Sequence, residues 1–203
     1  MNDILDGYAA AATPELIERY EAFDPAVLYA PVLDLLPRTP GRVADIGTGT
    51  GRDAAWFTAQ GHRVLAVEPV RALREAGMAR HGDRGITWLD DTLPDLSAAR
   101  ELGPFDLVTM NGVWQHIDDT ARAVAMPVLA AMLAPGGRLV LALRHGPGVA
   151  GRRAFPMSDE ATIAAAGGCS LALLRRQDTA SHQAGNRALG VRWTWMAFER
   201  PEI

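Results

Sequence analysis

The sequence predicts an α/β protein whose mostly parallel sheet is covered by helices on both faces. After Gly41, apolar runs of four to six residues alternate with amphipathic stretches, a pattern typical of parallel strands joined by helices. Towards the end of the sequence, the strand-like runs 170–175 and 191–199 follow each other without a helix between them, so they pair most easily as an antiparallel hairpin. The sheet should therefore contain one reversed strand near its edge.

Short helices are predicted ahead of the sheet. Thr13 suits a helix cap and Pro14 suits the first helical position, so one helix should begin there. A second helical pattern covers residues 26–36, and Pro37 stops it.

Seven strands and four further helices follow from the apolar spacing. Strands are expected over residues 42–46, 62–67, 86–89, 105–110, 138–143, 170–175 and 191–199. Helices are expected over residues 52–60, which Gly61 closes, and over 70–80, about 118–133 and 158–166. Residues 177–189 are polar and rich in turn-forming residues.

Composition limits the function classes. The 203 residues are 48% hydrophobic and 22% charged, as in an ordinary soluble domain, and the net charge of −4 favours neither nucleic acid nor an anionic membrane as a partner. All twenty basic residues are Arg, which excludes a P-loop lysine and Schiff-base chemistry. The acidic N-terminus does not resemble a signal peptide, and no apolar run approaches the ~18 residues that span a membrane, so we expect a cytoplasmic protein.

The single cysteine is Cys169. Alone it forms neither an internal disulfide nor a cysteine cluster for zinc, and we expect no metal site. Its flanking residues predict the start of a strand, with the thiol buried as a small hydrophobic group.

A glycine-rich loop, DIGTGTG over residues 45–51, follows the first predicted strand. Glycines let the backbone turn sharply and approach a ligand, and the next helix offers free N–H groups. The loop does not match the dinucleotide fingerprint GxGxxG/A when Gly47 is taken as the first glycine, because the last position then falls on Arg52. When Gly49 is taken as the first glycine the fingerprint is satisfied, with Ala54 in its last position. That alignment, however, extends the loop far into the predicted helix and leaves Gly47 unexplained.

Five segments in order resemble the motifs of class I S-adenosylmethionine-dependent methyltransferases, whose loop is GxGxG. They are VADIGTGTGRDA (43–54), VLAVE (64–68), ITWLDDTLP (86–94), FDLVTMNGVWQHI (105–117) and LAPGGRLVL (133–141), and they span about half the chain. The resemblance implies a doubly wound, Rossmann-like, seven-stranded sheet in one methyltransferase domain over residues 1–203. Within it, residues 1–40 would form a helical lid, 41–145 the cofactor-binding core and 146–203 a substrate-side region.

The resemblance also implies the contacts of S-adenosylmethionine. Glu68, followed by Pro69, would accept hydrogen bonds from the two ribose hydroxyls, because a carboxylate presents two acceptor oxygens to a diol. Either Asp90 or Asp91 would hold the adenine amino group, with ordinary turn chemistry as the alternative for both. The contacts near the methionine end would be Asp45, Gly47, Thr48, Gly49, Gly51, Asn111, Val113 and, from the lid, Tyr8.

A general base is needed only if the methyl acceptor must lose a proton. His116 and His145 are the candidate catalytic residues, since both follow the carboxyl ends of predicted strands, where ligands bind in open α/β sheets. Three arginines after the fifth strand could recognise an anionic acceptor or simply face solvent; they are Arg144, Arg152 and Arg153. Trp193 and Trp195 share one face of the last strand, where core packing is expected.

The segment that follows the fourth predicted strand limits the classes of methyl acceptor. The segment Asn-Gly-Val-Trp at 111–114 has neither the Pro-Pro-Tyr of many base-methylating enzymes nor a Pro-Cys nucleophile, so nucleic acid is not the expected substrate. We expect methyl transfer to the oxygen or nitrogen of a small molecule, by a monomer or homodimer. Two alternatives stay open, namely a cofactor-binding sensor without transferase activity and a nicotinamide-dependent oxidoreductase.

Overall fold

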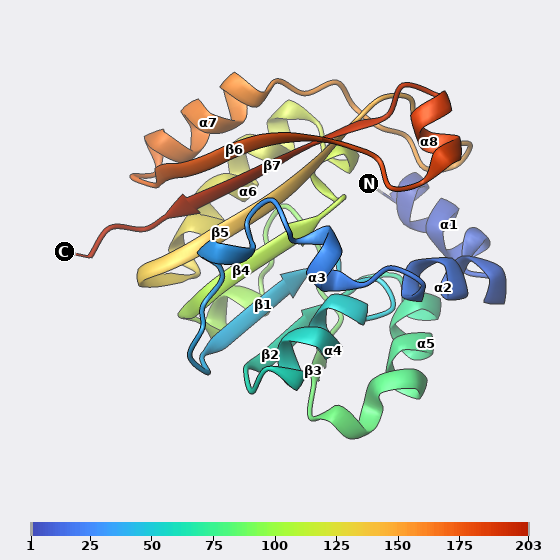
Figure 1. Ribbon diagram of the computed structural model, residues 1–203, viewed down its shortest axis with the longest axis horizontal. Helices are drawn as coiled ribbons and strands as arrows, with labels where there is room; N and C mark the ends of the chain where they lie inside the picture. Colours follow the sequence, from blue (N-terminus) through green and yellow to red (C-terminus); the bar gives the residue numbers. More distant parts are fainter. Residues whose placement is uncertain (1, 203) are drawn as a thin grey trace.

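The computed structural model describes residues 2–202, which form one seven-stranded sheet with the strand order β3-β2-β1-β4-β5-β7-β6 (Figure 1). The strands are β1 (Arg42–Ile46), β2 (Arg63–Val67), β3 (Thr87–Leu89), β4 (Phe105–Asn111), β5 (Leu133–His145), β6 (Ala172–Ala180) and β7 (Arg192–Glu199). β1 to β5 pair in parallel, and β7 is antiparallel to both β5 and β6. The predicted sheet with one reversed strand near its edge is confirmed.

Eight α-helices and four short 3-10 turns accompany the sheet within the described residues. The helices are α1 (Asn2–Ala11), α2 (Pro14–Glu21), α3 (Pro25–Leu28), α4 (Arg52–Ala59), α5 (Arg71–His81), α6 (Asp119–Ala131), α7 (Asp159–Gly168) and α8 (Ala184–Ala188). The 3-10 turns are Leu33–Leu35, Gly82–Arg84, Ala99–Leu102 and Trp114–His116. Side-chain caps fix several helix starts; Asp118 accepts from the Ala121 N–H and Ser158 from the Ala161 N–H.

Alternate residues of each strand supply two hydrophobic cores, one on each face of the sheet. On one face Met126 and Leu129 of α6 and Ala166 of α7 pack against strand residues such as Leu141 and Met196. On the other face Tyr29 and Phe57 pack with the neighbouring strand positions Ala142 and Trp195. Because side chains of a strand alternate between faces, this division also fixes the direction of residues at the strand ends.

The segment before the sheet differs from the sequence prediction. The helix expected over residues 26–36 is only α3 and a later 3-10 turn, because Pro31 interrupts the pattern and a proline inside a helix removes a donor and clashes with the preceding turn. Tyr29 and Val32, on either side of Pro31, are instead fully buried against the sheet. The helix α1 was not predicted.

Strand boundaries near the C-terminus differ as well. β5 begins at Leu133, before the predicted residue 138, and a register shift near Phe105 accommodates its glycine-rich start. β6 begins two residues later than predicted and continues to Ala180, because an exposed edge strand accepts polar side chains that do not look like a buried strand. Cys169 is the half-buried C-cap of α7 rather than part of a strand.

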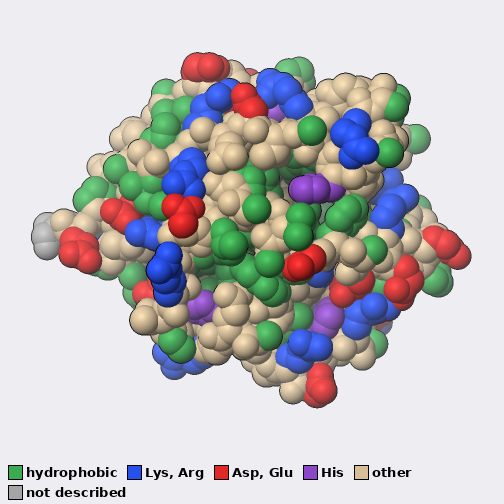
Figure 2. Space-filling view, viewed as in Figure 1, with side chains coloured by type: hydrophobic (Ala, Val, Ile, Leu, Met, Phe, Trp, Pro, Cys, Tyr) green, Lys and Arg blue, Asp and Glu red, His purple; other side chains and the backbone are tan. Residues whose placement is uncertain are grey.

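The parallel strands all end at one edge of the sheet, and several segments gather there. Figure 1 shows α1 and α2 beside this edge, with α8 and α5 on either side of them. Figure 2 shows acidic and basic side chains intermixed over the visible face of the molecule, so neither sign dominates it. Within residues 2–202 no helix combines the length and the apolar character needed to cross a membrane.

Candidate functional site

A cavity of about 470 Å³ lies at the carboxyl ends of the parallel strands, within the size range of small-molecule sites. Most of the residues predicted from sequence line it, namely Tyr8, Asp45, Gly47, Thr48, Gly49, Glu68, Pro69, Asp91, Asn111, Val113 and His116. Gly51, Asp90 and His145 do not. Those eleven predicted residues therefore meet at one site although they come from five segments of the chain.

The glycine loop forms the floor of this cavity. Gly47, Gly49 and Gly51 have φ of +70°, +61° and +79°, the left-handed region that favours glycine. A Cβ on Gly47 would lie 2.4 Å from Cγ2 of Val113. The N–H groups of Gly47 and Thr48 both donate to the carbonyl of Val67, at 2.8 and 3.0 Å, which ties the loop to the end of β2.

Alanine at two of these glycines should have unequal effects. Gly49→Ala has room, since its nearest neighbour would be a Tyr20 ring carbon at 3.7 Å, so only the left-handed strain of about 1–2 kcal/mol applies. A Cβ on Gly51 would lie 2.4 Å from Cη2 of Trp88, which adds an overpacking cost of about 1–3 kcal/mol. Urea unfolding measures both; equal losses of unfolding free energy would contradict the close Gly51–Trp88 packing.

Two carboxylates lie beneath the loop. Asp45 is buried and accepts hydrogen bonds from the hydroxyls of Thr48 at 2.5 Å and Thr109 at 3.0 Å. Burial, and then the neighbouring charge of Asp53, raise the pKa of Asp45 above its ordinary value. Of these two carboxylates, only Asp53 has an ion-pair partner within residues 2–202, namely Arg52 at 2.6 Å. This end of the cavity is therefore suited to a positively charged group.

The sequence analysis did not identify Asp53 as part of the site. Asp53 accepts from the Tyr29 hydroxyl at 3.2 Å and from the side-chain amide of Asn111 at 3.3 Å. Through Asn111 it connects the first turn of α4 to the end of β4. Its signal in the sequence was an acidic residue in the first helical turn after the glycine loop.

Glu68 lies at the end of β2, directly beside the loop. One carboxylate oxygen accepts from the Gly49 N–H at 2.8 Å and the other from the Val70 N–H at 2.8 Å. The residue is 5% exposed and lines the cavity. Burial raises the pKa of Glu68 to about 7, although the two backbone donors favour the charged form.

This shift makes the stability of the ligand-free protein depend on pH through Glu68. The folded-state pKa of about 7 exceeds the ordinary value of 4.5, so the folded state holds a proton that the unfolded state has released between these values. Stability is then lost as pH rises through this window, by roughly 3 kcal/mol in total. We expect the unfolding free energy of the wild type to fall by that amount relative to Glu68→Gln between about pH 4.5 and pH 8. Parallel pH profiles of the two proteins would contradict it.

The two aspartates after β3 have different surroundings. The carboxylate of Asp90 is 65% exposed and forms an ion pair with Arg74 at 2.7 Å, outside the cavity. Asp91 lines the cavity and accepts from the N–H groups of Thr92, Ala98 and Ala99 at 2.8 to 2.9 Å. Turn chemistry therefore occupies much of the Asp91 carboxylate, but only Asp91 of the pair is placed to reach a ligand.

His116 meets Tyr8 of α1 at the opposite side of the cavity. Its Nδ1 lies 2.8 Å from the carbonyl of Arg153, which can only accept, so Nδ1 carries the proton of the neutral ring. Nε2 is then the acceptor for the Tyr8 hydroxyl at 2.8 Å and lies 3.2 Å from the amide of Gln115. Burial lowers the pKa of His116, so the ring is neutral near pH 7 and can accept a proton.

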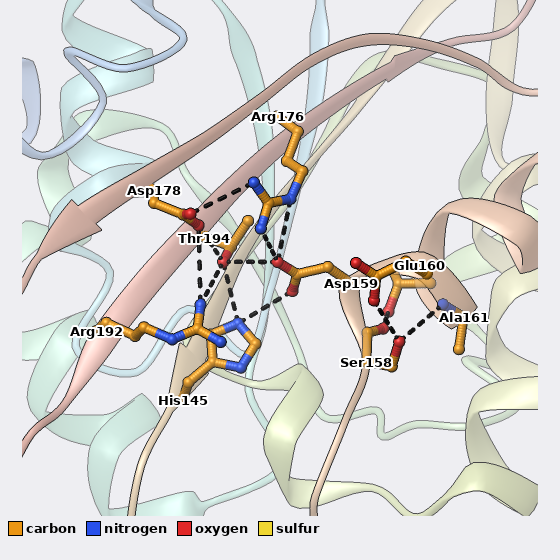
Figure 3. A network of polar contacts seen from close by, with 10 residues as sticks. His145, Ser158, Asp159, Glu160, Ala161, Arg176, Asp178, Arg192 and Thr194 are labelled. Atoms are coloured by element: carbon orange, nitrogen blue, oxygen red, sulfur yellow. Dashed lines mark hydrogen bonds and ion pairs between the residues drawn. The ribbon is translucent and has the colours of Figure 1, made fainter.

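His145, the second predicted catalytic residue, does not line the cavity and lies instead in a polar network beside the start of α7 (Figure 3). Its Nε2 lies 3.1 Å from a carboxylate oxygen of Asp159, the first residue of α7, and 3.1 Å from the hydroxyl of Thr194. Arg176 of β6 contacts the same carboxylate at 2.6 Å. The cluster connects β5, β6, β7 and the start of α7, so the structure gives His145 a role in packing.

We expect His145→Gln to lower the unfolding free energy by about 1–3 kcal/mol, because it leaves buried Asp159 with one partner fewer. The affinity for a ligand of the cavity should not change, since His145 does not line it. Urea unfolding and ligand titration of the same variant separate the two effects. A tenfold loss of ligand affinity at unchanged stability would show that His145 takes part in binding at the cavity, contrary to this prediction.

The roof of the cavity comes from segments that no motif marked. Phe23, which follows α2, faces His182 of the β6–β7 connection, with ring centroids 6.5 Å apart. Trp193 and Trp195 share one face of β7 as predicted, yet both also line the cavity. Further lining residues of the connection are Ser181, Gln183 and Asn186. Only the folded chain brings these residues over the glycine loop.

Comparisons with known sequences all find methyltransferases. A family model described as "Methyltransferase domain" matches residues 19–199. An uncharacterized methyltransferase of Mycobacterium tuberculosis is 31% identical over 143 residues, which cover 64% of this chain and 54% of that protein. A protein-L-isoaspartate O-methyltransferase of Methylorubrum extorquens is 31% identical over 141 residues, covering 68% and 58%. The chain thus spans about half the length of the curated relatives it matches.

Solved structures show the same fold at lower identity. A 1,6-didemethyltoxoflavin-N1-methyltransferase from Burkholderia thailandensis, with its substrate and S-adenosylhomocysteine bound, has a TM-score of 0.67 at 22% identity. The match covers 99% of this chain and 85% of that one. An S-adenosylmethionine-dependent methyltransferase from Mesorhizobium loti has a TM-score of 0.65 at 19% identity, covering 87% and 99%.

Proposed function

This chain belongs to the methyltransferase-domain family of class I S-adenosylmethionine-dependent methyltransferases, and we propose that it transfers the methyl group of S-adenosylmethionine to a small-molecule acceptor. The observation that carries the proposal is the junction of Glu68 with the glycine loop. Both carboxylate oxygens of Glu68 face backbone N–H groups at the edge of a cavity whose floor consists of left-handed glycines. A diol can be held there while the backbone approaches the rest of the ligand.

The residues around the cavity fit the parts of this cofactor. Glu68 would bind the ribose hydroxyls, and Asp91, rather than Asp90, would accept from the adenine amino group. The acidic end under the loop, with Asp45 and Asp53, would stabilise the positively charged methionine portion. Residues 1–40 would cover the site as a lid, residues 41–145 bind the cofactor, and residues 146–203 contact the acceptor.

When bound, S-adenosylmethionine supplies an activated methyl group on a sulfonium sulfur. Its sulfur would be the leaving group for that methyl and would take up the electron pair of the carbon–sulfur bond. The task left to the protein is to align the acceptor with that methyl and to exclude water, for which the lid residues Tyr8, Tyr20 and Phe23 are placed. The acceptor's proton would pass to the Tyr8 oxygen while Tyr8 would donate its own proton to Nε2 of His116.

Transfer of labelled methyl groups tests the proposal. The protein is incubated with methyl-labelled S-adenosylmethionine and cell extracts, and products are separated by size and identified by mass spectrometry. We expect label in small molecules, and we expect its loss with the Glu68→Ala variant. A protein that binds S-adenosylhomocysteine but labels nothing in any extract would instead be a sensor, contrary to the proposal.

A further inference from the structure

Charged side chains of both signs line the cavity, and the carboxylates among them lie on one side. Carboxylates gather beneath and beside the glycine loop, where they are Asp45, Asp53, Glu68 and Asp91. Of the lining arginines, Arg52 is paired with Asp53 at the glycine loop, whereas Arg144 at the end of β5 and Arg152 of the following loop lie on the side of Tyr8. Because the carboxylate side is assigned to the positively charged cofactor, the arginine side faces whatever occupies the acceptor half.

Neither Arg144 nor Arg152 forms an ion pair with a carboxylate anywhere in residues 2–202. Arg144 donates to the carbonyl of Pro147 at 2.8 Å. The guanidinium carbon of Arg152 lies 5.2 Å from the centroid of the Tyr8 ring, and its buried Nε has no hydrogen-bond partner within the described chain. The adjacent Arg153 does not line the cavity and pairs with Asp3 at 3.1 Å. The same loop therefore holds one arginine outside the cavity with a carboxylate partner and one inside the cavity without.

Arg152 also hydrogen-bonds to the side chain of Tyr20, but neither guanidinium group has a carboxylate partner in the described chain, and the two repel each other. Burial lowers the pKa of Arg144 most, and the positive charge of Arg152 lowers it further, while Tyr8 opposes both effects. Two like charges held half-buried in one cavity are unfavourable unless an anion lies between or beside them. A neutral or cationic acceptor would leave this repulsion in place, whereas an anionic oxygen group would relieve it.

Tyr8 connects this arginine pair to the reacting position. Its ring lies under Arg152 and its hydroxyl donates to His116, so an anion held by Arg152 lies next to the proton relay. Trp193 forms a flat apolar wall nearby, close enough that a Cβ on Gly112 would be 3.1 Å from its ring. The acceptor half thus combines two cations, one aromatic wall and one base.

We infer that the acceptor is a small molecule with a flat apolar body, anchored through a carboxylate by Arg144 and Arg152 and methylated on a neighbouring hydroxyl or amine. Guanidinium groups suit a carboxylate because they donate two parallel hydrogen bonds to it. The inference deepens the proposed function and rests on it, since it takes the other half of the cavity to hold the cofactor.

Matched acids and amides test the inference. Benzoate, salicylate and anthranilate, and the corresponding primary amides, are titrated by calorimetry into protein saturated with S-adenosylhomocysteine. We expect each acid to bind at least about tenfold more tightly than its amide, and Arg144→Gln and Arg152→Gln each to weaken the acids about tenfold while affecting the amides less. The control is Arg100→Gln, which removes the same charge from an exposed side chain that does not line the cavity and should preserve the preference.

Three results would overturn the inference. They are equal binding of acids and amides, undiminished binding of the acids by both arginine variants, and failure of every acid to bind at about 10 mM. Binding of S-adenosylhomocysteine alone is measured first. Its absence would contradict the proposed function and the inference with it, whereas normal cofactor binding without a preference for acids would contradict only the inference.

Discussion

Replacing Glu68 with Ala is expected to weaken the binding of S-adenosylhomocysteine by at least about a hundredfold. The substitution removes both carboxylate oxygens, which accept from the Gly49 and Val70 N–H groups and would also accept from the proposed ribose diol. Hydrogen bonds to a charged group contribute about 1.5–3 kcal/mol each. Since about 1.4 kcal/mol corresponds to a tenfold change in affinity, two lost bonds exceed a hundredfold. The two backbone donors that Glu68 now satisfies would lose their partners as well, which loosens the loop.

Two further variants make this result specific. Glu68→Gln keeps one acceptor oxygen and should lie between the wild type and Glu68→Ala. Glu75→Gln removes an equal charge from the exposed face of α5, where Glu75 pairs only with Arg71 in the described chain, and should bind as the wild type does. If Glu68→Ala, shown to be folded by circular dichroism, bound S-adenosylhomocysteine within threefold of the wild type, the ribose assignment would be wrong.

Replacing His116 with Gln is expected to lower kcat by about 10²–10⁴-fold for an acceptor that must lose a proton. The unprotonated Nε2 that receives the Tyr8 hydroxyl is the proton acceptor of the proposed relay, and an amide at this position cannot take up a proton. Cofactor affinity should change little, so the loss should appear in kcat rather than in the KM for S-adenosylmethionine. Tyr8→Phe keeps the base but breaks the relay, and its kcat should lie between the two.

The pH profile separates catalysis from mere positioning. Burial lowers the pKa of His116, so the rate of the wild type should fall with decreasing pH at values below the ordinary histidine range near 6.5. His116→Gln should lack this acidic limb and be nearly flat there. A variant with reduced kcat but an unchanged pH profile would show that His116 positions the acceptor without accepting its proton.

The order of strands and helices in the sheet could be predicted because it follows from local rules. Glycines, strand-ending acids and apolar periodicity lie within a few residues of the features they specify, as the loop at 45–51 and Glu68 illustrate. The helix expected over residues 26–36 was wrong because one internal proline outweighed a good apolar pattern. Local rules therefore describe the floor of the cavity better than its surroundings.

The acceptor side depends on directions that sequence reasoning leaves open. Arg144 and His145 are neighbours at the end of β5, so their side chains point to opposite faces of the sheet. Which of them faces the cavity is decided by the long-range packing of β5 with β7 and α7. The roof at residues 179–186 is likewise brought over the loop only by the folded β6–β7 connection.

The central claim is that the cavity is a site for S-adenosylmethionine, and calorimetry with three ligands tests it most directly. The account predicts that S-adenosylhomocysteine and S-adenosylmethionine each bind at one site per chain, and that NADH binds at least about a hundredfold more weakly. Tight binding of NADH without binding of either adenosyl compound would contradict it, and would favour the dinucleotide alignment that begins at Gly49.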